Sequence, residues 1–82
     1  MSNSIYNDFA EQFAASSITS LVDSFNRQVG NRGWTSARAA HDLALIDELK
    51  RRGIDVSAVF DGTVISFTHH VELDNNSLVI RK

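Results

Sequence analysis

Glycine and proline usage constrains this chain most, because proline is absent and only four glycines interrupt the sequence. Proline removes a backbone donor and breaks helices and central strands, so its absence leaves long elements uninterrupted. Up to Arg52, apolar residues recur at spacings of three and four, which is typical of amphipathic helices. After Gly53 the chain reads as strands separated by short turn signals. The pattern therefore predicts helices first and a sheet last.

The N-terminal helical pattern covers residues 7–29 and changes face partway along. One face carries Ile5, Tyr6, Phe9 and Phe13, and the other carries Ile18, Leu21, Val22, Phe25 and Val29. On a continuous helix these faces lie more than about 100° apart. The hydroxyl of Ser16 or Ser17 can cap a new helix at the change, so we predict a bend or break within residues 14–17. The alternative is one straight helix that places each face against a different partner.

A further helix is predicted from a cap at Thr35 or Ser36 to about Arg52. Its apolar face consists of Ala39, Leu43, Ile46 and Leu49, widened by Leu45. Near the end of this helix, acidic residues lie four positions before basic ones, a spacing that stabilises helices. A glycine then ends the helix. We expect Ile54 to fold back onto Leu49, as the residue after a glycine cap commonly does.

Two short turn signals organise the last third. Residues 54–60 and 63–73 flank Asp61-Gly62, which predicts a type I′ turn with Gly62 at positive φ. The implied register pairs Phe60 with Thr63, Ala58 with Ile65, and Val56 with Phe67 on one face. A second turn at Asn75-Asn76 pairs Leu73 with Leu78 and Val71 with Ile80 on the same face.

Both registers put apolar residues on one side, which predicts a single α+β domain over residues 1–82. Its two to three N-terminal helices precede a three-stranded antiparallel β-meander, in the order α-α-β-β-β, with the helices packed on one sheet face. These registers leave each edge of the central strand half covered, one open near residues 71–73 and the other near residues 64–67. Unpaired edges invite pairing with another chain, so a homodimer is one expectation.

Composition excludes several classes of site. There is no cysteine, so disulfides, thiolate metal sites and a cysteine nucleophile are impossible, and we expect a cytoplasmic protein. No apolar run approaches the ~20 residues of a membrane span. Domains that bind nucleic acid over a broad surface are usually basic, whereas this chain has a net charge of −2, so any nucleic-acid-binding surface must be a local basic patch.

The polar residues do not form a recognisable catalytic or metal-binding motif. His69 and His70 point to opposite faces of a strand, and His41 lies on a helix away from them. Asp42 lies within an apolar helical arc, where a structural pair, with Arg38 one turn earlier or with a partner from the first helices, is favoured over a catalytic acid. No phosphate-binding loop or nucleophile elbow is present. We therefore predict no metal, no cofactor and no enzymatic activity.

The segment over residues 27–38 is the strongest functional candidate. Arg27, Arg32 and Arg38 surround a glycine-containing turn and the only tryptophan, Trp34. Arginine beside an aromatic ring suits phosphates and stacked bases. The structural interpretation, in which Trp34 packs on the core and the arginines are solvated, is favoured because the whole chain is acidic.

The function that fits these expectations is a small intracellular interaction module without catalytic chemistry. It would bind another protein or itself through the half-open sheet. The alternative is a nucleic-acid-binding accessory protein that uses the loop of residues 27–38.

Overall fold

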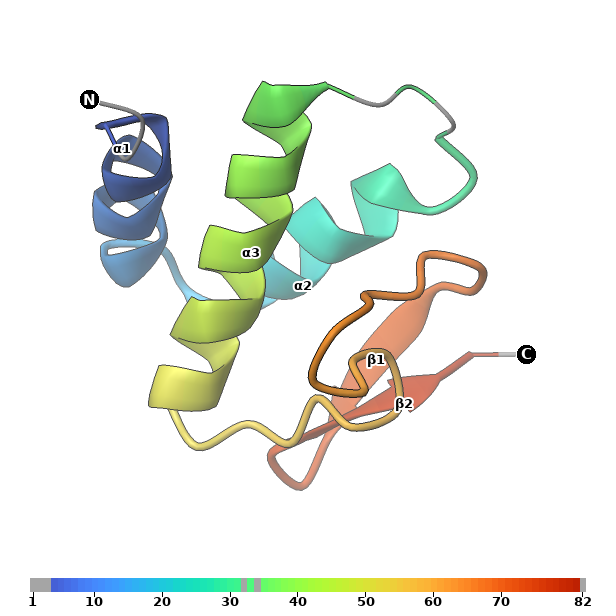
Figure 1. Cartoon of the computed structure of the whole chain (residues 1–82). Coiled ribbons are helices and arrows are strands. Elements are labelled where there is room, and N and C mark those ends of the chain that lie inside the picture. The colour runs from blue at the N-terminus through green and yellow to red at the C-terminus, as the bar shows by residue number, and fades with distance from the viewer. Residues whose placement is uncertain (1–3, 32, 34, 82) are drawn as a thin grey trace.

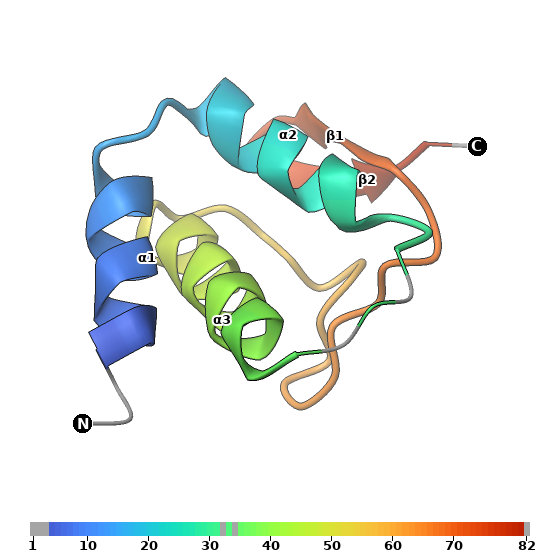
Figure 2. The ribbon, with the colours of Figure 1, turned by 90° about the horizontal axis from the view of Figure 1, so that it is seen from above.

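The structure is a computed structural model that describes residues 4–31, 33 and 35–81. Within these residues the chain forms helices α1 (Ser4–Ala14), α2 (Ile18–Gln28) and α3 (Ser36–Arg51), followed by strands β1 (Val71–Asp74) and β2 (Ser77–Ile80). The longest helix, α3, crosses the molecule (Figure 1). Seen from above, α1 lies on one side of α3, and α2 with the β1–β2 hairpin lies on the other (Figure 2).

The predicted break between the first two helices is confirmed. Ser17 caps α2 by accepting a hydrogen bond from the backbone N–H of Ser20 at 3.1 Å. Because the chain turns there, Phe13 from α1 and both Leu21 and Phe25 from α2 reach the same buried core. A straight helix would have sent the two apolar faces in different directions.

Both predicted ends of α3 are confirmed. The hydroxyl of Thr35 accepts from the N–H of Arg38 at 3.0 Å and caps the first turn. At the other end Gly53 takes a φ of +80°, and the N–H of Ile54 donates to the carbonyl of Leu49 at 3.0 Å. This left-handed stop turns the chain back, and Ile54 joins the core.

The β1–β2 hairpin has the predicted register. Val71 pairs with Ile80 and Leu73 with Leu78. The turn residues Asn75 and Asn76 both have positive φ, 50° and 64°, as a type I′ turn requires. Val71 and Leu78 are buried, so this face of the hairpin closes the core.

The predicted third strand is wrong. Between α3 and β1 the described residues form isolated bridges and turns, and the element order is α-α-α-β-β. The N–H groups of Val59 and Phe60 both donate to the carbonyl of Val56, at 3.0 and 2.9 Å, so residues 56–60 make one helical turn. That turn puts Val56 and Val59 on the same buried side, whereas a strand would have put them on opposite faces.

The turn at Asp61-Gly62 is wider than predicted. One carboxylate oxygen of Asp61 accepts from the N–H groups of Thr63 and Val64, at 2.9 and 2.8 Å. This carboxylate cap enlarges the loop, so Phe60 pairs with Ile65 instead of Thr63. Gly62 has the expected positive φ of 101°, but Asp61 does not, so the predicted type I′ geometry is wrong.

Gly62→Val should lower the free energy of unfolding by more than about 1 kcal/mol, because a β-branched residue resists positive φ. A Cβ at Gly62 would meet nothing within 4 Å, so the cost comes from the backbone alone. Urea denaturation measures the change. Thr63→Val is the control, because it introduces the same side chain at the adjacent position, where φ is ordinary. Its free energy of unfolding should lie within about 0.5 kcal/mol of wild type. Equal stability of the two variants would contradict this account of the turn.

The two strand edges that were predicted to be open, near residues 71–73 and near residues 64–67, both differ from the prediction. At Val71 the outer edge of β1 is closed by Asn26 of α2, whose amide accepts from the N–H of Val71 at 2.8 Å and donates to its carbonyl at 3.0 Å. Near residues 64–67 there is no central strand to leave open, and the carbonyl of Phe67 instead accepts from the N–H of Gly30 at 3.4 Å. Residue Asp55 forms a parallel bridge with Ser77 and covers part of β2.

Candidate functional site

An apolar groove of about 460 Å³ lies between α3 and the loop that follows the helical turn of residues 56–60. We call it the α3 groove. Its lining from α3 consists of Arg38, Ala39, Asp42 and Leu43, and its lining from the loop consists of Phe60, Gly62, Thr63, Val64, Ile65 and Phe67. The carboxylate cap of Asp61 holds the loop in the shape that forms one wall.

Two large apolar side chains at this groove remain exposed. Leu43 is 45% exposed on α3, and Val64 is 62% exposed on the loop. Between them, the half-buried side chains of Phe60, Ile65 and Phe67 pack against the core. A water-exposed apolar surface of this kind marks a binding site more often than an isolated exposed leucine does.

The base of the groove is polar, and its polar atoms are mostly paired within the protein; the exception is Arg38 Nε, which is buried without a hydrogen-bond partner among the described residues. Arg38 Nε lies 3.4 Å from the buried carboxylate of Asp42, as the spacing of one helical turn predicted. The same guanidinium donates to the carbonyls of Asn31 and Gly33 at 2.7 and 2.5 Å, and it lies over the ring of Phe67. These bonds tie the loop before α3 to the helix and leave the groove lined by a neutralised pair.

The other oxygen of Asp42 contacts His41 Nδ1 at 3.0 Å. The imidazole of His41 packs edge-on against the rings of Phe9 and Phe13, with centroid distances of 5.0 and 5.2 Å. His41 therefore helps to join α1 to α3. Within the described part of the chain, no group of three His, Asp or Glu side chains is placed to hold a metal ion.

Of the four arginine and tryptophan residues singled out from the sequence, the structure describes Arg27 and Arg38. Arg27 is exposed in the last turn of α2, and Arg38 is half-buried at the base of the α3 groove. Arg32 and Trp34 lie outside the described residues. The sequence interpretation missed Leu43 and Val64 as site residues, because it assigned Leu43 to the core face of its helix and placed Val64 within the predicted strand of residues 63–73.

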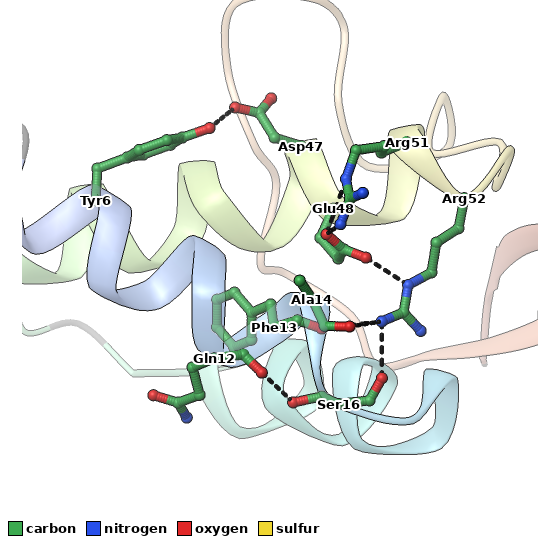
Figure 3. A network of polar contacts seen from close by, with 9 residues as sticks. All are labelled: Tyr6, Gln12, Phe13, Ala14, Ser16, Asp47, Glu48, Arg51 and Arg52. Atoms are coloured by element: carbon green, nitrogen blue, oxygen red, sulfur yellow. Dashed lines mark hydrogen bonds and ion pairs between the residues drawn. The ribbon is translucent and has the colours of Figure 1, made fainter.

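A second polar cluster joins the C-terminal ends of α1 and α3 (Figure 3). The buried carboxylate of Glu48 accepts from Arg51 and Arg52. Arg52 continues to the carbonyls of Phe13 and Ser16, at 2.9 and 2.7 Å, and so closes the end of α1. Burial favours the neutral form of Glu48, but the two arginines outweigh that effect and hold its pKa below the ordinary value.

Tyr6 makes a further polar contact between α1 and α3. Its hydroxyl donates to Asp47 at 2.5 Å, and this hydrogen bond, together with burial and the charge of Asp47, raises the pKa of Tyr6. The cluster uses its donors and acceptors on the protein itself, so its role is structural. This assignment leaves the α3 groove as the candidate site.

None of the helices in the described residues is long and apolar enough to span a membrane. Comparison with protein-family models, with curated proteins and with solved structures finds no match for this chain. The functional argument therefore depends on the geometry of the α3 groove.

Proposed function

We propose that the protein is a non-enzymatic interaction module that binds another protein through the α3 groove. The observation that carries this proposal is the pair of exposed side chains, Leu43 and Val64, on either side of a groove of about 460 Å³. The partner inserts an apolar side chain between them. Burying apolar surface at this point contributes binding free energy at roughly 25 cal/mol per Å² removed from water, before the cost of association.

The charge of the lining selects an uncharged occupant. The charged groups that line the groove are Arg38 and Asp42, which face each other, and the guanidinium also satisfies loop carbonyls. A charged side chain entering the groove would lose water without gaining a free counterion, which is costly. An aliphatic or aromatic side chain carries no charge, so it enters the groove without this desolvation cost.

The same contacts argue against the nucleic-acid alternative at Arg38. Phosphate binding by arginine needs several free N–H donors on the guanidinium. Arg38 directs its terminal nitrogens at the carbonyls of Gln28, Asn31 and Gly33. A phosphate would have to displace these bonds, which hold the start of α3 in place.

Selection from a random 12-residue peptide library on the immobilised full chain tests the proposal. We expect the selected peptides to share an apolar residue and to bind at least about tenfold more weakly to Leu43→Gln and to Val64→Gln. Ile5→Gln is the matched control, because Ile5 is also 45% exposed on a helix but does not line the groove. Its binding should equal that of wild type.

Three outcomes would overturn the proposal. Selection of no peptide, or equal binding of the selected peptides to all three variants, would exclude the α3 groove as a protein-binding site. Light scattering provides the third: a wild-type dimer that Leu43→Gln converts to a monomer would show that the occupant is a second copy.

A further inference from the structure

The outer edge of β1, which faces away from β2, is half open. In the observed register Glu72 and Asp74 exchange hydrogen bonds with β2, so the backbone groups of Val71 and Leu73 point to the outer edge. Asn26 occupies both groups of Val71. Among the described residues, no hydrogen bond reaches the N–H or the carbonyl of Leu73. One donor and one acceptor are therefore available beside the Asn26 side chain.

A second groove, of about 270 Å³, runs along this edge between α2 and β1, which lie side by side (Figure 2). Ile18 and Val22 of α2 are half-buried in it, and Leu73 is 38% exposed. Its apolar floor and the free backbone groups form one continuous surface. The charged side chains that line this surface are Asp23, Glu72 and Arg81, all exposed, so acidic residues outnumber basic ones there.

The charges on β1 decide between a second copy and a different protein. Side chains alternate along a strand, so Glu72 and Asp74 lie on the opposite face from Leu73, and both are exposed. Arg81 is 3.9 Å from Glu72, a loose pair. If a second copy paired around Leu73, Glu72 would lie opposite Asp74 of that copy, twice. Like charges directly opposite each other destabilise a strand pair, so the edge favours a basic segment over a second copy.

We infer that the β1 edge binds an extended segment of another protein in which one apolar residue is flanked by lysine or arginine. The apolar residue pairs antiparallel with Leu73, exchanging both backbone hydrogen bonds, and its side chain covers Ile18 and Val22. The flanking basic residues fall on the other face, beside Glu72 and Asp74. Asn26 fixes the register, because it closes the adjacent backbone position. This surface is separate from the α3 groove.

A titration of the ¹⁵N-labelled full chain with the peptide acetyl-Thr-Lys-Val-Lys-Thr-amide tests the inference. We expect chemical-shift changes centred on Leu73 and slower exchange of its amide hydrogen. Two control peptides separate the contributions: one replaces both lysines with glutamate, and the other carries N-methylvaline, which lacks the N–H that pairs with Leu73. Each should bind at least about tenfold more weakly.

The double variant Glu72→Lys, Asp74→Lys is the matched change in the protein. It alters two exposed side chains and should reverse the preference, so that the glutamate peptide binds better than the lysine peptide. Equal binding of the N-methylated peptide would overturn strand pairing, and equal binding of the glutamate peptide would overturn the charge argument. Shift changes centred on Leu43 or Val64, or none at millimolar peptide, would overturn the site itself.

Discussion

Arg52→Met should lower the free energy of unfolding by roughly 3 kcal/mol, because this one side chain joins the C-terminal ends of α1 and α3. Arg52 donates to the buried carboxylate of Glu48 at 2.6 Å and to the carbonyls of Phe13 and Ser16. Methionine keeps the aliphatic stem but leaves the C-terminal carbonyls of α1 and one oxygen of Glu48 without these donors. For a domain of this size the melting temperature should fall by more than about 10 °C.

Arg51→Met is the matched control. Arg51 also donates to Glu48, but its side chain is 65% exposed and its bonds do not extend to α1. We expect it to cost less than about 1 kcal/mol, the scale of an exposed ion pair. Equal losses for the two variants would show that the bonds from Arg52 to α1 carry no stability.

At acidic pH, the free energies of unfolding of wild type and Arg52→Met should differ less than at neutral pH. The pKa of Glu48 is lowered in the folded protein, so its ion pairs stabilise the fold above the ordinary glutamate pKa of about 4.3. That stability is lost as the pH falls through the folded pKa. The carbonyl bonds of Arg52 do not titrate, so part of the difference persists. Thermal unfolding between pH 7 and pH 3 measures this, and a difference independent of pH would contradict the role of the ion pair.

Asn26→Leu should lower the free energy of unfolding by about 2 kcal/mol, because it removes both hydrogen bonds to Val71 without changing side-chain size much. Val71 is 1% exposed, so water cannot easily replace the lost partners. Urea denaturation measures the loss, and hydrogen exchange of the Val71 amide should accelerate with it.

Asn26→Asp is the control for this position. A carboxylate can still accept from the N–H of Val71, but it cannot donate to the carbonyl and repels it. It should therefore remain less stable than wild type even though one of the two bonds survives. A variant as stable as wild type would show that the donated bond contributes nothing.

Local signals predicted the helices and the second hairpin. The hydroxyl caps at Ser17 and Thr35 and the two positive-φ asparagines each determine geometry within a few residues. The prediction of a third strand was wrong for an equally local reason. Val56 and Val59 are three positions apart, the spacing of a helical turn, and Asp55 accepts from the N–H of Ser57 at 2.9 Å to start that turn.

The candidate site was less predictable, because it depends on what covers each apolar side chain. Leu43 belongs to the apolar stripe of α3, but the chain offers no described segment that covers it fully. Its exposure follows from the path of residues 60–67, which the carboxylate of Asp61 sets. The pair of Arg38 and Asp42, in contrast, was predictable from a spacing of four along one helix.

The long-range bonds of Arg52 and Asn26 also bear on the order in which the fold assembles. The bonds that hold α1 join residues 36 to 41 positions apart, and the bonds from Asn26 to Val71 span 45. While the chain emerges from the ribosome, the bonds from Arg52 to the end of α1 cannot form until residue 52 has appeared. The β1–β2 hairpin closes through a two-residue turn and can form on its own timescale of microseconds. We therefore expect the hairpin to form early and the long-range contacts of α1 and α2 to form later, with a folding rate set by these distant contacts.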